Sequence, residues 1–169
     1  MKKDFEEQFE VFNSFAQQSS NFCWTLDKPE STMSLGTTLT KKFPELNILL
    51  LNGPLGAGKT TLVKGIAKSL SITETITSPT FPLSQHYPSG SPPLIHLDLY
   101  RIEEPSAANE FFLQEEEESQ TMGALMVVEW PERLSLTMTD AWRGKLQYSS
   151  KTQTRVFQLI TPLVSDNNL

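Results

Sequence analysis

Residues 46–60 have the sequence LNILLLNGPLGAGKT, in which an apolar run leads into a glycine-rich turn, a lysine and a threonine. The last eight of these residues match the spacing G-x-x-x-x-G-K-[ST] of a phosphate-binding loop. In such a loop the glycines let backbone N–H groups turn toward the phosphates, the lysine reaches the β- and γ-phosphates, and the hydroxyl binds Mg²⁺. The sequence therefore predicts that Lys59 binds phosphate and that Thr60 binds the metal.

The residues on both sides of the loop support this interpretation. Residues 48–51 form a continuous apolar run, which is typical of a parallel strand covered on both faces. After the loop, Leu62, Ile66 and Leu70 recur every four residues on one face of a helix, whose N-terminus would direct free N–H groups at the phosphates. A turn that merely joins a strand to a helix is the alternative, but three glycines followed by Lys-Thr rarely coincide by chance.

Length and composition indicate a single globular domain. The chain has 169 residues, 38% hydrophobic and 20% charged, and its longest uncharged apolar run is far shorter than a membrane span. The N-terminus carries no signal-peptide pattern, and a single cysteine fits a reducing compartment. We expect a cytoplasmic protein with no membrane partner.

The net charge of −6 argues against direct binding to a nucleic-acid backbone, because such binding needs a face rich in lysine and arginine. The only dense charged block, residues 115–118, is acidic. Any link to nucleic acid would therefore run through a partner.

The ends of the chain differ from the predicted domain at 21–162. Residues 1–20 contain Phe5, Phe9, Phe12 and Phe15, which share one face of an added amphipathic helix. Such a helix usually packs on its own domain, and docking to a partner is the alternative. We expect the polar tail 163–169 to be disordered.

The remaining pattern predicts an α/β fold. We expect a P-loop NTPase-like, mainly parallel sheet flanked by helices, with antiparallel C-terminal strands. A helix over 30–43 would be capped by Ser31 or Thr32. The other expected elements are a strand at 22–26, a loop with at most short edge strands at 72–93, a strand at 94–101, a helix at 103–120, a strand at 124–128, and strands at 145–148 and 155–160.

Two acids at or near the ends of apolar strands are candidates for metal binding and hydrolysis. Asp98 lies near the end of the strand at 94–101, and Glu129 directly follows the strand at 124–128. Phosphoryl transfer needs an acid that holds Mg²⁺ and a residue that orients the attacking oxygen. A strand–helix–strand crossover can bring Asp98 to the edge of the sheet beside the phosphate loop. A helix cap or an ion pair is the alternative role for either acid alone.

Four blocks of sequence resemble a known family. They are residues 32–36 (TMSLG), 53–61 (GPLGAGKTT), 78–81 (SPTF), and the pair 96–101 (HLDLYR) and 129–132 (EWPE). Over residues 22–160 the chain resembles bacterial TsaE (YjeE), the small ATPase of tRNA threonylcarbamoyladenosine biosynthesis. Two departures are Pro54, where the family usually has an acidic residue, and residues 107–112, which lack its usual Glu-Leu and glycine.

The resemblance implies ATP and Mg²⁺ as cofactors and a role for each matching residue. Lys59, Asp98 and Glu129 would be catalytic, and Thr60, Asp98 and Glu129 would serve the metal. Residues 78–80 would form a switch segment, and Thr32 would lie near the adenine. The expected nucleotide-binding residues are Thr32, Gly53, Leu55, Gly56, Ala57, Gly58, Lys59, Thr60, Thr61, Thr80 and Trp130.

The resemblance also implies partners. TsaE proteins hydrolyse ATP weakly alone and act with TsaB and TsaD, whose complex places the threonylcarbamoyl group on the adenosine beside the anticodon. An acidic chain would then meet tRNA only indirectly, through that complex.

Other nucleotide-dependent functions can be weighed on the residues. A GTPase would carry an N-K-x-D motif for guanine, which this sequence lacks, so ATP is the expected nucleotide. A small-molecule kinase needs an arginine-rich lid, whereas the arginines here stand singly at 101, 133, 143 and 155. A nucleotide-gated binding module with little turnover of its own remains open.

Overall fold

The structure is a computed structural model that describes residues 21–79, 81–149 and 154–162. The expected N-terminal helix, the expected tail and Thr80 lie outside these residues. None of the described helices is long and apolar enough to cross a membrane.

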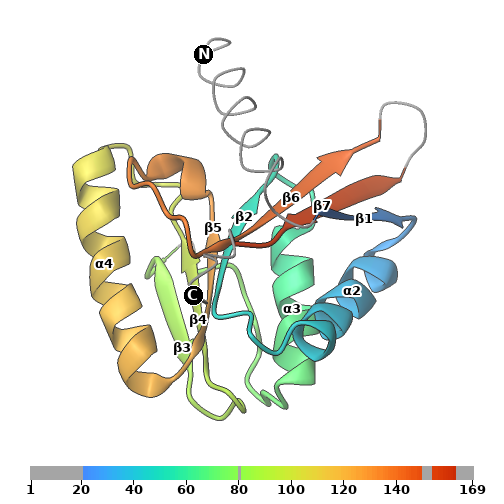
Figure 1. Ribbon diagram of the computed structural model, residues 1–169, viewed down its shortest axis with the longest axis horizontal. Coiled ribbons are helices and arrows are strands. Elements are labelled where there is room, and N and C mark those ends of the chain that lie inside the picture. Colours follow the sequence, from blue (N-terminus) through green and yellow to red (C-terminus); the bar gives the residue numbers. More distant parts are fainter. Residues whose placement is uncertain (1–20, 80, 150–153, 163–169) are drawn as a thin grey trace, which may run out of the picture.

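One seven-stranded sheet forms the centre of the molecule (Figure 1). Its four middle strands are parallel, and strands at both edges run antiparallel to their neighbours. This arrangement confirms the predicted fold class. In spatial order the strands are β1 (Asn21–Leu26), β7 (Arg155–Ile160), β6 (Trp142–Tyr148), β2 (Ile48–Asn52), β5 (Leu125–Glu129), β4 (Leu94–Asp98) and β3 (Ser84–Tyr87).

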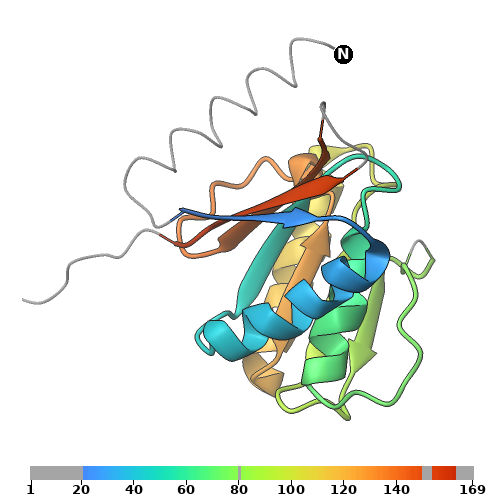
Figure 2. The ribbon, with the colours of Figure 1, turned by 90° about the vertical axis from the view of Figure 1, so that its right-hand side faces the viewer.

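The central strands are apolar because helices cover both of their faces. Helices α2 (Pro29–Lys42) and α3 (Lys59–Ser69) lie together on one side, and α4 (Pro105–Met122) lies on the other (Figures 1 and 2). Two apolar clusters result. One includes Leu39, Leu62 and Ile66 against Val127, and the other places Phe112 against Ile95 and Val128.

The strand order differs from the simplest expectation for Asp98. Strand β5 lies between β2 and β4, so Glu129 ends the strand beside β2, from which the glycine-rich loop starts, and Asp98 ends the strand beyond it. The two acids nevertheless stand opposite each other in register. The carboxyl edge of the sheet therefore collects both of them, as predicted.

The start of α2 was predicted wrongly. Its N-cap is Lys28, with Pro29 in the first turn, rather than Ser31 or Thr32. Proline is preorganised for the first turn of a helix, which fixes the start earlier than the polar residues suggested. The Ser31 hydroxyl instead donates to Asp27 Oδ1 at 2.5 Å, and Thr32 is buried.

Two glycines let α2 and α3 approach each other closely. A Cβ at Gly36 would lie 2.3 Å from the carbonyl oxygen of Leu62, and one at Gly65 would lie 1.9 Å from that of Met33. The Thr37 hydroxyl also donates to the Gly65 carbonyl at 3.0 Å. This contact anchors the helix that begins at Lys59.

We expect Gly65→Ala to destabilise the fold, because backbone atoms must move apart to admit the methyl group. Overpacking of this kind costs about 1–3 kcal/mol or more, and each kcal/mol lowers the melting temperature by roughly 2–4 °C in a chain of this length. Thermal unfolding measures the effect. Lys64→Ala, at an exposed position of the same helix, is the matched control, and an equal melting temperature for both variants would contradict the close contact.

Candidate functional site

The loop between β2 and α3 adopts conformations that suit glycine. Gly58 directly precedes α3 and has φ 105°, which side-chain-bearing residues rarely adopt. At the other end of the loop, a Cβ on Gly53 would lie 2.5 Å from the carbonyl oxygen of Leu146. The glycines of the motif therefore serve a tight turn that ends at a helix N-terminus, where backbone N–H groups are available to an anion.

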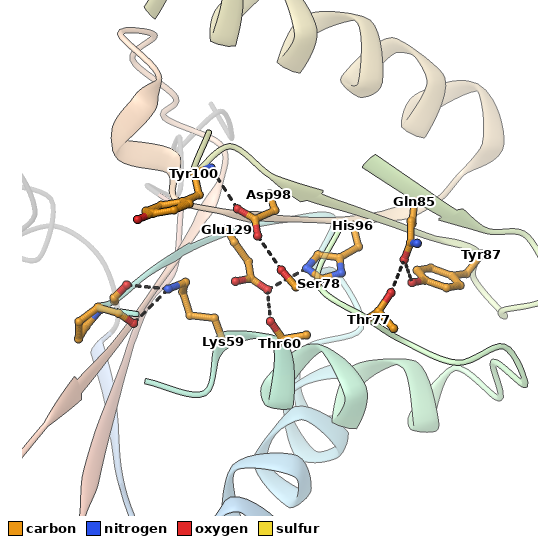
Figure 3. A network of polar contacts seen from close by, with 12 residues as sticks. Lys59, Thr60, Thr77, Ser78, Gln85, Tyr87, His96, Asp98, Tyr100 and Glu129 are labelled. Atoms are coloured by element: carbon orange, nitrogen blue, oxygen red, sulfur yellow. Dashed lines mark hydrogen bonds and ion pairs between the residues drawn. The ribbon is translucent and has the colours of Figure 1, made fainter. Parts of the chain in front are cut away.

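Lys59 is 5% exposed and lies beneath this loop. Its Nζ donates to the carbonyl oxygens of Gly53 at 2.7 Å and Pro54 at 3.2 Å (Figure 3). The same nitrogen lies 4.0 Å from the centre of the Trp130 ring. Burial lowers the pKa of Lys59, and the nearby Glu129, Glu132 and Asp98 oppose this shift. The ammonium is thus held against the loop by oriented dipoles and an aromatic face.

Glu129 joins the loop helix to the sheet. Its Oε1 accepts a hydrogen bond from the Thr60 hydroxyl at 2.9 Å and lies 2.9 Å from His96 Nε2 (Figure 3). Glu129 is 3% exposed. The structure therefore brings together the predicted hydroxyl and one of the two predicted acids.

Asp98 has partners of its own. Its Oδ2 accepts from the Ser78 hydroxyl at 2.7 Å, and its Oδ1 accepts from the Tyr100 backbone N–H at 3.0 Å. Asp98 is also buried, at 4% exposed. It ties the segment expected to be a switch to the carboxyl edge of the sheet.

The residues after β5 form a sharp turn over the site. The backbone of Trp130 adopts the left-handed conformation, with φ 60° and ψ 47°. This conformation is strained for a bulky residue, and such strain is often found at functional sites. The ring centre of Trp130 lies 4.8 Å from that of Tyr100. The short helix η1 (Pro131–Arg133) follows and places Glu132 Oε2 2.9 Å from the Asn52 side-chain amide, which donates.

Two contributors to this site were not assigned a role from the sequence. His96 is a polar residue within an otherwise apolar strand, and Glu132 follows Glu129 by three residues, so both had a visible signal. Their partners lie far along the chain, 33 residues from His96 and 80 from Glu132. The pattern of residues could not supply those contacts.

The other predicted binding residues surround the loop in different environments. Thr32 is buried in the first part of α2, with its methyl group 3.7 Å from a Cβ built on Gly58. Ala57 is buried, Thr61 is half-buried, and Leu55 is 74% exposed at the tip of the loop. The structure brings Thr32 to the loop, and its contact with adenine stays a prediction.

Burial raises the pKa of Glu132 above its ordinary value, while its own backbone N–H, Lys59 and Arg133 oppose the shift. The folded protein therefore binds this proton more tightly than the unfolded chain does. The contribution of Glu132 to the free energy of unfolding therefore falls as the pH rises from its pKa in the unfolded chain to its pKa in the folded protein. We expect Glu132→Gln to raise the melting temperature relative to the parent protein at about pH 7, and by less at about pH 4.

Paired thermal scans at the two pH values test this expectation. Glu103→Gln, at an exposed position, is the control for loss of one surface charge. If Glu132→Gln raises the melting temperature more at about pH 4 than at about pH 7, the folded protein stabilises the ionised form of Glu132, and the expectation is wrong.

The described residues contain no group of three or more His, Cys, Asp or Glu side chains that could hold a metal by themselves. Mg²⁺ differs from such metals because it is usually held by one or two carboxylates together with substrate phosphates, and keeps several waters. The Thr60 hydroxyl at the start of α3 contacts Glu129, and Asp98 stands opposite Glu129 on the adjacent strand. These three residues are a donor set of this type. They fit Mg²⁺ that enters with a nucleotide.

A glycine-rich loop after the central strand, a Lys-Thr pair at the helix start and two acids on neighbouring strands define a P-loop NTPase-like α/β protein. The fold is similar to the crystal structure of YdiB from Bacillus subtilis, with a TM-score of 0.63 and 27% sequence identity. That similarity covers 85% of this chain and 86% of the solved one.

A model of the family described as "Threonylcarbamoyl adenosine biosynthesis protein TsaE" matches residues 26–157, so the chain belongs to the TsaE family. Several relatives carry the name tRNA threonylcarbamoyladenosine biosynthesis protein TsaE, and two of them show the extent of the similarity. The one from Nostoc sp. is 45% identical over 105 residues, which is 62% of this chain and 65% of that protein, just under two thirds. The one from Mycobacterium tuberculosis is 37% identical over 143 residues, 78% of this chain and 82% of that protein.

Proposed function

We propose that this chain is a Mg²⁺-dependent ATPase that supports threonylcarbamoylation of the tRNA adenosine next to the anticodon. Family membership supports the pathway. The observation that carries the ATPase assignment is the contact between the Thr60 hydroxyl and Glu129 beside the buried Lys59. These are the groups that a phosphate loop needs to hold a metal–nucleotide complex.

Each residue in the site has a proposed task. The loop N–H groups and Lys59 would bind the phosphates, and Thr60, Glu129 and Asp98 would hold the metal or its waters. Bound Mg²⁺ would neutralise negative charge on the phosphate oxygens. Trp130, Thr32, Thr61 and Thr80 would complete the nucleotide site.

The partners that we propose are TsaB- and TsaD-like proteins, with tRNA reached only through their complex. The net charge of −6 supports this arrangement because an acidic chain has little attraction for a phosphate backbone. The single cysteine fits a reducing compartment, so we place the reaction in the cytoplasm. Turnover should be weak until the partners are present.

One observation favours the nucleotide-gated module as a second aspect of this function. The Ser78 hydroxyl bonds to Asp98, which links residues 78–79 to the site where the metal would lie. A change in nucleotide state could therefore be passed to this segment, as in other switches that respond to the γ-phosphate. A kinase has less support, since Arg101 contacts the Phe81 ring and Arg143 donates to the Met138 carbonyl rather than forming a lid.

The deciding experiment measures ATP hydrolysis by the chain alone and with TsaB- and TsaD-like proteins from the same organism. We expect slow hydrolysis alone, faster hydrolysis in the mixture, and retention of the partners in a pull-down that depends on ATP. Competition with GTP should show preference for ATP. Phosphate transfer to a small acceptor without partners would instead identify a kinase.

A further inference from the structure

His96 occupies a position where an apolar residue would be expected. It lies in the middle of β4 between the fully buried Ile95 and Leu97, and its own side chain has no exposed surface. Its Nδ1 is buried without a hydrogen-bond partner among the described residues. An unsatisfied buried polar atom costs about 1–3 kcal/mol, so packing alone does not account for an imidazole here.

The other ring nitrogen connects His96 to the site. Nε2 lies 2.9 Å from Glu129 Oε1, and this same oxygen accepts the Thr60 hydroxyl at 2.9 Å. Strand register explains the approach. Because Asp98 stands opposite Glu129 and alternate residues of a strand share a face, His96 projects to the face of the sheet that α3 covers.

We propose that His96 is a positioning residue, which donates its Nε2–H to Glu129 and fixes the direction of that carboxylate. Oε1 is held by His96 and Thr60, and Figure 3 shows the second oxygen on the side of Glu129 that faces Lys59. Oε2 is thereby left for the nucleotide–metal centre. The inference rests on the proposed function for the role of Glu129, while the hydrogen bond itself can be tested without it.

The arrangement fixes which ring nitrogen carries the hydrogen. Nε2 is the ring nitrogen that faces Glu129 Oε1, an oxygen that already accepts from the Thr60 hydroxyl, so Nε2 is the donor. A hydrogen on Nδ1 would be a buried donor without an acceptor, which is costly. His96 is therefore the tautomer that carries a hydrogen on Nε2 and none on Nδ1.

The chain supplies a matched control in its other histidine. His86 Nε2 lies 2.6 Å from Glu115 Oε2, so it too pairs with a glutamate. Its partner is on α4, on the opposite face of the sheet from α3, and its side chain is 37% exposed. His86→Gln therefore alters a similar pair outside the site.

Partner-stimulated hydrolysis is compared for His96→Gln, His96→Asn, His96→Leu and His86→Gln. The Gln amide nitrogen can reach the place of Nε2, whereas the shorter Asn and the apolar Leu cannot donate to Glu129. We expect His96→Gln and His86→Gln to retain kcat within a few-fold, and His96→Asn and His96→Leu to lose about 10–100-fold, as for other residues that orient a metal-site carboxylate. ATP affinity by calorimetry should change little.

A test by double substitution separates positioning from packing. In a Glu129→Gln background, His96→Asn should lower kcat by no more than about two-fold further, because Glu129, the side chain that His96 orients, has already lost its charge. Three outcomes would each overturn the proposal. The first is an equal loss of kcat in His96→Gln and His96→Leu, and the second is full activity of His96→Leu. The third is a loss of kcat in the double variant that equals the product of the losses in His96→Asn and Glu129→Gln. His96→Asn keeps the comparison available if His96→Leu does not fold.

Nitrogen NMR of the nucleotide-free protein gives a readout that needs no activity. With two histidines in the chain, His86→Gln assigns the signals, and we expect His96 to show a protonated Nε2 and an unprotonated Nδ1. A protonated Nδ1 would overturn the inference. An inactive parent protein with its partners present would contradict the proposed function, and the tautomer would still decide whether the hydrogen bond exists.

Discussion

Lys59→Ala is expected to abolish measurable ATP binding while the domain stays folded. The ammonium sits under the loop between the Gly53 and Pro54 carbonyls and the Trp130 ring. A hydrogen bond to a charged group is worth about 1.5–3 kcal/mol, and several would be lost on the β- and γ-phosphates together. We therefore expect at least about a 100-fold loss of affinity, measured by calorimetry with Mg²⁺ present.

Two further variants separate charge from shape and from general surface effects. Lys59→Arg keeps the positive charge, but its planar guanidinium does not match a site built around a compact ammonium, so it should also bind poorly. Lys64→Ala removes an exposed charge from the same helix and should bind ATP normally. Unchanged affinity in Lys59→Ala, together with an unchanged melting temperature, would refute the phosphate-loop assignment.

The local parts of this site were predictable because one continuous stretch encodes them. The apolar strand β2, the glycine turn and the helix from Lys59 follow one another along the chain, and each has a pattern that depends on near neighbours. The same holds for α4, which forms despite the departure from the family pattern at residues 107–112. Its start at Pro105 and its end before the left-handed Gly123 are short-range signals.

The strand order was not predictable in the same way. Apolar runs show that β2, β4 and β5 are buried, but three similar strands can be arranged in more than one order. The structure inserts β5 beside β2, so the later acid, Glu129, is the one that contacts Thr60. From the sequence, the strand that ends in Asp98 was expected beside β2 because it follows β2 more closely along the chain. In the structure the strand that ends in Glu129 takes this position instead.

The connections among polar side chains also lay beyond the sequence. The motif blocks already contained His96 and Glu132, yet nothing in their spacing identifies Glu129 or Asn52 as partners. Such contacts depend on register between strands and on the left-handed turn at Trp130. The roles of Thr80 and of the phenylalanine-rich segment at 1–20 stay predictions, since both lie outside the described residues.

The second large effect concerns the two acids together. Asp98→Asn and Glu129→Gln should each lower partner-stimulated hydrolysis by about 100-fold or more, while ATP affinity changes much less. The reason is that charge at the metal matters most when charge develops in the transition state. The fold should tolerate both changes, because the Gln carbonyl can still accept from Thr60 and the Asn carbonyl from the Tyr100 N–H.

A double-mutant cycle decides whether the acids serve one centre. They face each other in register and are both buried, but they hold separate partners, Ser78 for Asp98 and Thr60 with His96 for Glu129. If both act on one Mg²⁺–ATP centre, the double variant should be only slightly slower than the worse single variant, because residues that act as a unit fail together. Two independent losses of about 100-fold would instead multiply to about 10,000-fold. That result would mean that the acids do not act on a shared centre, and that the Asp98–Ser78 contact acts separately from metal binding.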